Sequence, residues 1–365
     1  MTTQTTEVRI RKNDLREVTL AEGAMPALAS GAVRLRIERF ALTANNITYA
    51  AFGEAMAYWN FFPTAAGFGL LPVWGFAMVE ASDHPEISVG ERLYGYFPMA
   101  HHVDLLPSRV SASAFIDVST HRAQLPAAYQ RYRRISADAQ HDPSQEDEQA
   151  LLWPLFMTSF LIEDFLNEHD LFGADTIVLS SASSKTALGI AACARQRAVA
   201  GRRVLGLTSA ANLAFCRRTG DYDDVLTYEQ LTQVPAQTHS VFVDMAGNGR
   251  LLHDLHHHFG EHLRYSCMVG GTHWEARETQ HGLPGAKPTF FFAPHHIRKR
   301  QQDWGPGGVD QRFAEAWARF LPSLRRWLRI QRTDGATAII AAYREVLEGR
   351  IDPQDGLILG WSGDR

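Results

Sequence analysis

The segment VLSSASSKTALGIAACA, residues 178–194, has the residue types of a loop that could hold a nucleotide. A dinucleotide fingerprint places small residues, spaced G-x-G-x-x-G, between a strand and a helix, where they allow a tight turn and close approach to a pyrophosphate. The matching positions are Ala182, Ser184 and Ala187, which are small although none is glycine. Backbone N–H groups at the start of the helix would bind the anion. An ordinary strand, turn and helix with a capping serine is the alternative.

Two residues at the start of this helix add to the possible anion site. Lys185 supplies a cation and Thr186 a hydrogen-bond donor. A Walker A loop fits poorly, because Leu179 and Ser184 stand where its two glycines should be. The candidate cofactor-binding residues of the loop are Ser181, Ala182, Ser183, Ser184, Lys185 and Thr186.

The end of the next expected strand bears on the choice between NAD and NADP. NAD-preferring sites place an acid there to hold the ribose 2′-hydroxyl. Here the strand ends at Thr208 and Ser209, and Asn212, Arg217 and Arg218 follow. Hydroxyl, amide and cationic groups suit a 2′-phosphate, so the sequence favours NADP(H). An ordinary loop followed by a helix with surface arginines is the alternative.

The sixteen histidines of the chain raise the question of a metal site. His253, His256, His257 and His258 recur at helical spacing in HDLHHHFGEH, next to acids. We interpret this group as a solvated helix face, and we expect no metal site.

Composition limits the classes of protein. With 36 basic and 40 acidic residues among 365, the net charge of −4 gives no overall basic balance for binding nucleic acid or an anionic membrane. No apolar run reaches a membrane span, and the start has no apolar signal segment. The three cysteines, Cys193, Cys216 and Cys267, are too few and too far apart for a disulfide framework. A reducing cytoplasm is the simplest compartment.

The first 110 residues or so are predicted to be rich in β-strands. Val33, Leu35 and Ile37 alternate with charged residues, which is typical of a half-buried strand, and residues 73–82 and 91–98 are further candidates. Short strands at short spacing indicate a compact, β-barrel-like fold. The polar segment that follows ends in the acids 146–148, which we expect to be a solvated helix start.

From residue 151 onward, strands alternate with helices. A helix-length apolar run is followed by strands and by helices with small residues, a pattern typical of a parallel sheet covered on both faces. We therefore expect a Rossmann-like, doubly wound unit. The expected strands are 175–183, 202–209, 241–247 and 264–271, and the later elements are an apolar helical stripe from Phe313 to Leu324, a helix over 336–349 and a strand over 357–359.

The order of these segments resembles the medium-chain dehydrogenase/reductase superfamily over most of the chain. The segments that carry the resemblance are VRLRIERFALTANNITYA, VWGFAMVEASDHPEISVGERLYGYFP, DTIVLSSASSKTALGIAACA, VLGLTSAANLAFCRRTGDYDDVLTY and AAYREVLEGRIDPQDGLIL. Others, such as VDMAGNGRLL and FFFAPHHIRKR, look like a branch of that superfamily from which no substrate carries over. The fold that the resemblance implies is α/β, with a Rossmann-like domain and a GroES-like catalytic domain.

The sequence departs from the zinc-dependent members of the superfamily. Those enzymes hold catalytic zinc with a Cys in the asparagine-rich turn and a His in a G-H-E motif, whereas this chain has residues 43–46, TANN, and Trp74-Gly75-Phe76 at the similar places. The four-Cys structural lobe is also missing. The resemblance therefore points to the zinc-free quinone oxidoreductases and enoyl reductases.

In the enoyl reductases of the superfamily a tyrosine shortly after the asparagine-rich turn supplies the proton, and Tyr58 occupies the similar place. Tyr49 is the second candidate acid, and Asn46 would orient substrate or nicotinamide. Thr158 resembles a position near the nicotinamide. The alternatives are a packed aromatic residue for Tyr58 and a threonine bonded to its own helix for Thr158.

The resemblance also implies further cofactor contacts. Tyr228 ends the segment similar to the second strand and helix of the nucleotide domain. Two later strand ends would line the nicotinamide ribose and ring, with ordinary glycine turns as the alternative. These ends contain Met245, Ala246 and Gly247, and Gly270, Gly271 and Thr272.

The sequence thus predicts a discontinuous catalytic domain, residues 1–148 completed by 293–365, and an inserted NADP-binding domain over 149–292. The expected activity is zinc-independent, NADPH-dependent reduction of an activated C=C or C=O in a small, apolar or aromatic substrate such as an enone, a quinone or an enoyl compound. An NADP-binding sensor or partner protein without redox turnover is the alternative. The resemblance makes a homodimer plausible.

Overall fold

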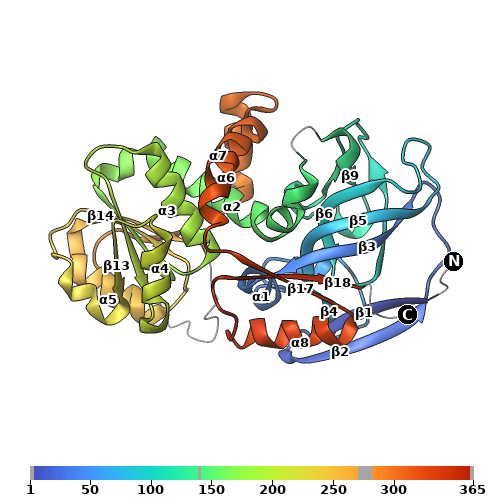
Figure 1. The fold of residues 1–365 in the computed structure, drawn as a ribbon, viewed down its shortest axis with the longest axis horizontal. Helices are drawn as coiled ribbons and strands as arrows, with labels where there is room; N and C mark the ends of the chain where they lie inside the picture. The colour runs from blue at the N-terminus through green and yellow to red at the C-terminus, as the bar shows by residue number, and fades with distance from the viewer. Residues whose placement is uncertain (1–3, 139–140, 270–281, 362–365) are drawn as a thin grey trace. The chain divides into compact units, whose positions relative to one another are not determined.

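The computed structural model describes residues 4–138, 141–269 and 282–361. The chain divides into two compact units, whose helices and strands are labelled in Figure 1. Unit 1 comprises Met1–Trp153 and Ile330–Arg365, and unit 2 comprises Pro154–Arg329. In the described ranges, no helix has both the length and the apolar character needed to cross a membrane.

Unit 1 is built on an antiparallel sheet whose central strand has the predicted alternation. Val33, Leu35 and Ile37 of β3 are fully buried. The larger sheet has the order β17-β18-β3-β5-β6-β10-β9-β8, with β7 also paired to β3, and a smaller sheet has the order β2-β1-β4. The strands are β1 (Gln4–Arg11), β2 (Asp14–Ala24), β3 (Val33–Leu42), β4 (Phe68–Leu70), β5 (Pro72–Ser82), β6 (Arg92–Pro98), β7 (His102–Leu105), β8 (Pro107–Ser108), β9 (Ala114–Asp117), β10 (Arg131–Arg134), β17 (Arg329–Asp334) and β18 (Asp355–Gly360). The helices are α1 (Ala44–Ala51), α8 (Ala336–Leu347), which packs on β2, and the first part of α2 (Glu146–Glu168).

The acidic start of α2 is buried, so the expectation of a solvated helix start is wrong. Glu146 is 3% exposed and Asp147 is 5% exposed. Glu146 forms ion pairs with Arg92 at 2.8 Å and with Arg39 at 2.9 Å. Asp147 accepts a hydrogen bond from Arg332 Nε at 2.6 Å. Arginines from β3, β6 and β17 therefore allow carboxylates to be buried that a local view of the sequence would leave in water.

Unit 2 contains the predicted parallel sheet, in the order β13-β12-β11-β14-β15-β16. Counted from β11 this is 3-2-1-4-5-6, the order of a doubly wound dinucleotide-binding fold, and every neighbouring pair is parallel. The order reverses between β11 and β14, and in such sheets ligands bind at the carboxyl ends of the strands beside this point. The elements are β11 (Thr176–Leu179), β12 (Arg203–Thr208), β13 (Asp224–Thr227), β14 (Ser240–Asp244), β15 (Leu263–Met268), β16 (Pro288–Phe290), α3 (Lys185–Arg197), α4 (Leu213–Thr219), α5 (Gly249–Phe259), α6 (Ala293–Trp304) and α7 (Gly308–Leu324).

Helices α6 and α7 pack within unit 2, whereas the sequence analysis assigned everything after residue 292 to the catalytic domain. The apolar stripe of α7 is the reason: Phe320 stacks on Phe156 of α2 with ring centroids 4.5 Å apart. The chain therefore returns to unit 1 at Ile330, where β17 begins the last part of that unit.

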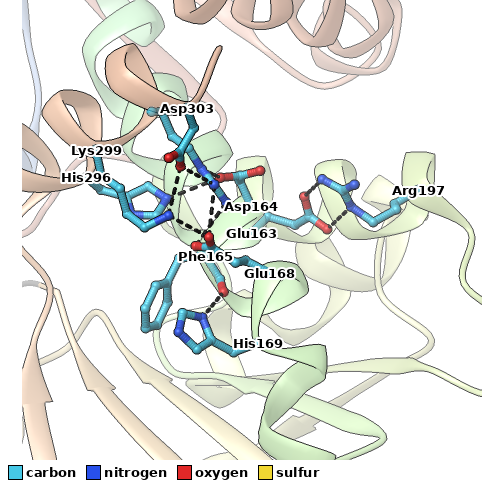
Figure 2. A network of polar contacts seen from close by, with 10 residues as sticks. Glu163, Asp164, Phe165, Glu168, His169, Arg197, His296, Lys299 and Asp303 are labelled. Atoms are coloured by element: carbon cyan, nitrogen blue, oxygen red, sulfur yellow. Dashed lines mark hydrogen bonds and ion pairs between the residues drawn. The ribbon is translucent and has the colours of Figure 1, made fainter.

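A network of charged side chains ties α6 and α3 to α2 (Figure 2). Asp164 accepts hydrogen bonds from His296 Nε2 at 3.1 Å and from Arg300 Nε at 2.5 Å. On the next residue of α2, Glu163 pairs with Arg197 of α3 at 2.6 Å. Burial opposes ionisation of Asp164, but the bonds from His296 and Arg300 outweigh it and lower its pKa.

We expect Asp164→Asn to destabilise unit 2 by about 3 kcal/mol at pH 7, because it leaves the buried Arg300 guanidinium and the His296 ring without their shared carboxylate. The lowered pKa of Asp164 means that its contribution is complete above pH ~5 and is lost as the pH falls through the native pKa, below the ~3.9 of a free aspartate. Urea unfolding, followed by intrinsic tryptophan fluorescence and circular dichroism, measures the difference at each pH.

The matched control is Lys299→Gln in the same network. The Lys299 side chain is 43% exposed, so its loss should cost less than ~1 kcal/mol. Equal destabilisation by the two variants, or a wild-type advantage that grows on acidification, would contradict the role of Asp164.

Candidate functional site

The bend after β11 is held by a residue in the left-handed conformation. Ser181 has a φ of 45°, a value that non-glycine residues adopt rarely and at a cost in free energy. Its N–H donates to the Tyr228 hydroxyl at 3.2 Å. Ser184 then caps α3, because its Oγ accepts from the Ala187 N–H at 3.2 Å. The chain thus turns as a glycine-rich loop does and delivers the N-terminus of a helix to the carboxyl edge of the sheet.

Ser180 joins this loop to the end of β14 across the switch point. Its Oγ donates to Asp244 Oδ1 at 2.7 Å and accepts from the N–H groups of Met245 at 2.8 Å and Ala246 at 3.1 Å. Ser180 is fully buried and Asp244 is 3% exposed. Two neighbouring strand ends are therefore locked together at the place where a doubly wound sheet binds its ligand.

The close approaches expected of the fingerprint depend on glycines that lie outside the loop. A Cβ atom on Gly206 of β12 would lie 2.8 Å from the Cβ of Ala182. On α3, a Cβ atom on Gly189 would lie 2.5 Å from Ser159 Oγ of α2. Gly206 thus lets Ala182 of the loop lie close to β12, and Gly189 lets α3 lie close to α2.

Polar groups link the loop to the end of β12. Asn212 Nδ2 donates to Ser183 Oγ at 3.0 Å. Ser209, just after β12, is partly exposed, whereas Thr208 is 1% exposed and belongs to the core. Arg217 Nη2 donates to the Val225 carbonyl at 3.0 Å.

These residues fit a dinucleotide. The helix N-terminus with its small-residue bend suits a pyrophosphate, and the groups that follow β12 are hydroxyls and an amide rather than a carboxylate. The residues that would hold the cofactor are the loop Ser181–Thr186 with Lys185 at its helical end, together with Ser209, Asn212 and Tyr228.

Three other predicted contacts have their backbone committed within the protein. The N–H groups of Met245 and Ala246 bond to Ser180 and Asp244, and the Gly247 N–H donates to Asp244 Oδ1 at 3.2 Å. Their role as cofactor contacts stays a prediction. Gly270, Gly271 and Thr272 lie outside the described residues.

The asparagine-rich turn forms the start of α1 in unit 1. Asn46 is 4% exposed; its Oδ1 accepts from the Thr43 N–H at 2.8 Å, and its Nδ2 donates to the Pro72 carbonyl at 2.9 Å. These bonds anchor the turn to β5. In unit 2, Thr158 Oγ1 donates to the Pro154 carbonyl of its own helix at 3.1 Å. Both side chains thus have structural partners, and their cofactor or substrate roles stay predictions.

The two candidate acids lie together in unit 1. Tyr58 begins the short helix η1 (Tyr58–Asn60), and its ring centroid is 4.7 Å from that of Tyr49 on α1. Tyr58 is 7% exposed and Tyr49 is 6% exposed. The hydroxyls of Tyr58 and Tyr129 are hydrogen-bonded to each other.

Sequence reasoning missed two further phenols of this group, Tyr96 and Tyr129. Tyr96 and Tyr129 have ring centroids 4.9 Å apart, and Trp74 lies 5.0 Å from Tyr96. We call Tyr49, Tyr58, Trp74, Tyr96 and Tyr129 the phenol cluster. Tyr96 could have been found from its place on an expected strand two residues from Tyr94, but Tyr129 lies in a polar segment that gave no signal.

Burial keeps the phenols of the cluster protonated. It raises the pKa of Tyr49, and it raises the pKa of Tyr58 despite the opposing hydrogen bond from Tyr129. It raises the pKa values of Tyr96 and Tyr129 well above the usual range. At neutral pH these groups are therefore proton donors rather than bases.

A buried ion pair fixes the frame around the cluster. Arg122 and Asp117, 1% and 0% exposed, pair at 2.7 Å. Arg122 Nε donates to the Phe61 carbonyl at 2.9 Å, directly after η1. The Tyr132 hydroxyl, which accepts from Arg122, donates to the Tyr96 carbonyl at 2.7 Å. The segment after Tyr58 and the strand of Tyr96 thus share one anchor.

The histidine-rich helix is only partly the solvated face that its sequence predicts. His256 is fully buried, with Nδ1 2.9 Å from the Pro284 carbonyl and Nε2 3.0 Å from Ser266 Oγ. His253 and His257 are exposed and stack on each other. In the described part of the chain, no three His, Cys, Asp or Glu side chains are grouped to hold a metal ion.

One cavity of about 140 Å³ lies in unit 2, away from the nucleotide loop. It is lined by Ile177 and Val204 near the amino ends of β11 and β12, and by Arg195 near the end of α3. Since doubly wound sheets bind nucleotides at the opposite edge, it is not the cofactor site.

Comparison with known proteins places this geometry in context. The structure of CurA from Vibrio vulnificus, solved in complex with NADPH, matches over 99% of this chain and 100% of its own, at a TM-score of 0.66 and 15% identity. A putative NADPH:quinone reductase from Mesorhizobium loti matches over 99% of both chains, at a TM-score of 0.63 and 13% identity. The CurK enoyl reductase matches over 98% of this chain and 99% of its own, at a TM-score of 0.54 and 12% identity. No curated protein matches by sequence.

At these identities the solved structures establish the fold, which is that of the medium-chain dehydrogenase/reductases, with a Rossmann-like sheet and GroES-like antiparallel sheets. The family model described as a protein of unknown function, DUF2855, matches residues 40–352. The chain therefore belongs to the DUF2855 family.

Proposed function

We propose that the chain binds NADPH at the carboxyl edge of the unit 2 sheet and uses it in the metal-free reduction of an activated C=C or C=O of a small, apolar or aromatic substrate. The observation that carries the proposal is the Ser180–Asp244 bond at the switch point, beside a capped helix N-terminus. The solved CurA complex with NADPH and the putative NADPH:quinone reductase, which share the fold, support it.

NADP is favoured over NAD by the residues after β12. Ser209 and Asn212 offer a hydroxyl and an amide at the place where NAD-binding proteins have a carboxylate. A carboxylate there would repel the 2′-phosphate of NADP, whereas a hydroxyl and an amide can donate hydrogen bonds to it. Asn212 is already held against Ser183, so the same side chain connects the loop to this position.

The phenol cluster supplies the proton of the reaction. NADPH, when bound, supplies a hydride to the electrophilic carbon of the substrate. Tyr58 donates its proton to the substrate oxygen or to the carbon next to the carbonyl, and the tyrosinate regains a proton from Tyr129, which is resupplied by solvent. Because burial raises the pKa of Tyr58, the cluster suits reduction, which needs a donor, better than oxidation, which needs a base.

Two further parts of the proposal rest on the sequence. A homodimer, implied by the resemblance, stays a prediction. The compartment is proposed to be a reducing one, because Cys193, Cys216 and Cys267 are buried as free thiols.

We expect the purified protein to bind NADPH at least tenfold more tightly than NADH and to oxidise it in the presence of a neutral acceptor. Titration calorimetry measures binding, and absorbance at 340 nm measures oxidation with a panel of quinones, enones and aldehydes, with and without EDTA. Absence of binding of either nucleotide by folded protein contradicts the proposal. Binding without oxidation across the panel would instead establish an NADP sensor.

Ser183→Asp tests whether the pyrophosphate binds at the N-terminus of α3, without unfolding the loop. A carboxylate at the N-terminus of α3 leaves helix stability unchanged or raises it by up to ~1 kcal/mol, but it repels a diphosphate. We expect the Kd for NADPH to rise at least tenfold. Gln311→Glu adds the same charge at an exposed position in the first turn of α7, a helix that follows α6 rather than a strand of the sheet, and should leave the Kd within about twofold. Equal effects of the two variants would place the diphosphate elsewhere.

Tyr58→Phe tests the proton donor. We expect kcat to fall about 100-fold when chemistry is rate-limiting, with NADPH affinity unchanged. Since burial raises the pKa of Tyr58 above that of a free tyrosine, wild-type kcat should lose no activity through this group between pH 6 and 9. Tyr343→Phe, which removes another buried phenol of unit 1 that donates to the Leu15 carbonyl, is the control. Full turnover by Tyr58→Phe excludes this residue as the donor.

A further inference from the structure

Two buried polar atoms of the phenol cluster have no partner among the described residues. They are the Tyr96 hydroxyl and the Trp74 indole N–H. Tyr96 is fully buried, and its ring lies 5.0 Å from that of Trp74. The Trp74 N–H lies near the Tyr49 hydroxyl but not in the geometry of a hydrogen bond.

Such orphaned groups are unusual in folded proteins. Each buried donor or acceptor that loses its hydrogen bond costs about 1–3 kcal/mol, and most buried polar groups find a partner. The backbone that carries Tyr96 is fixed, because its carbonyl accepts from Tyr132, which Arg122 and Asp117 hold in turn. Two unpaired groups in one rigid cluster point to a ligand atom that pairs with them.

The charge of that ligand follows from the neighbours of the phenols. Among the described residues, the groups that act electrostatically on Tyr49, Tyr58, Tyr96 and Tyr129 are other tyrosines, Trp74 and Asn45, and none of them is ionic at neutral pH. A carboxylate or phosphate would be desolvated there without a counter-cation, at a cost of several kcal/mol. A carbonyl oxygen accepts from both orphaned donors without that cost.

The shape of the ligand follows from the rings. Trp74 and Tyr129 are partly exposed, whereas Tyr49, Tyr58 and Tyr96 are buried. The ring centroids of Trp74 and Tyr129 lie 6.1 Å apart, and the two ring planes are inclined by 46°. An aromatic ligand could pack on these two rings at the distances that aromatic pairs prefer, with its oxygen directed toward the buried phenols.

We propose that Trp74, Tyr96 and Tyr129 form a binding site for an uncharged aromatic carbonyl compound, with Trp74 and Tyr96 donating to its oxygen and Tyr129 packing on its ring. This inference rests on the proposed function, because the ligand is the substrate of the proposed reduction. It adds to that function a binding role for three residues and the exclusion of anionic substrates.

Three probes of nearly equal shape test the site by titration calorimetry. Acetophenone has the ring and the carbonyl, α-methylstyrene has the shape without the oxygen, and benzoate has a charge. We expect wild-type protein to bind acetophenone about tenfold more tightly than either of the others. Tyr96→Phe should remove the preference over α-methylstyrene, and Trp74→Phe, which alters a less buried position, should reduce it.

Tyr94→Phe is the matched control. Tyr94 lies on β6, as Tyr96 does, but its hydroxyl donates to the Gln149 carbonyl at 3.4 Å. The variant therefore removes a buried phenol hydroxyl that already has a partner within the protein. It should keep the full preference for acetophenone. Circular dichroism confirms that each variant is folded, and Trp74→Phe carries the test if Tyr96→Phe does not fold.

The outcomes separate this inference from the proposed function. Retention of the preference in both Tyr96→Phe and Trp74→Phe overturns the site and assigns the two orphaned atoms to water, as does benzoate binding as tight as that of acetophenone. If both variants reduce the enones and quinones of the panel at the wild-type rate, the proposed reductase function stands and the binding site is disproved. Acetophenone binding that depends on Tyr96, without oxidation of NADPH by any acceptor, would support the site and disprove the reductase.

Discussion

The bond between Ser180 and Asp244 is the constraint on which the nucleotide half of this protein depends. It joins the ends of β11 and β14, the two strands between which a doubly wound sheet opens to its ligand. The same serine accepts from the Met245 N–H, which would otherwise be buried without a partner, and from the Ala246 N–H, which also donates to Asp244. The Ser180 hydroxyl therefore supplies a hydrogen-bond acceptor to buried N–H groups and also fixes the carboxyl edge of the sheet between β11 and β14. The bend at Ser181 and the cap at Ser184 come directly after this anchored strand end.

The absence of glycine from the loop shows what a dinucleotide fingerprint requires physically. The requirement is space between backbones, and space can be made on either side of a contact. Here Gly206 on β12 makes room for Ala182, and Gly189 on α3 makes room for Ser159. The remaining requirement, a residue with positive φ, is met by Ser181 at some cost in free energy. A motif search that counts glycines within the loop is therefore too strict for this architecture.

The sequence could predict what depends on local periodicity and failed where distant residues decide. The alternation at Val33, Leu35 and Ile37 and the small-residue helix after β11 identified both halves of the fold. The acids at the start of α2 looked solvated because their arginine partners, Arg39, Arg92 and Arg332, lie far away in the chain. The boundary after residue 292 was misplaced for a similar reason, since the stripe of α7 does not reveal which unit it covers. Of the candidate acids, resemblance found Tyr58 and Tyr49, but only the packing brings in Tyr129 from a polar segment.

The placement of charge within unit 1 explains why the phenol cluster can act as a donor. Several buried charges of this unit are matched in pairs: Arg122 with Asp117, and Glu146 and Asp147 of α2 with arginines of the sheet. Such pairs hold backbone segments in place, as Arg122 holds the Phe61 carbonyl, and their opposite charges largely cancel at a distance. The tyrosines next to them consequently experience burial rather than a net field, and burial alone favours the neutral, protonated phenol. A net positive charge in the same place would lower the pKa values and turn the cluster toward bases. The proton-donating character of the cluster is therefore a consequence of how completely the charges around it are paired.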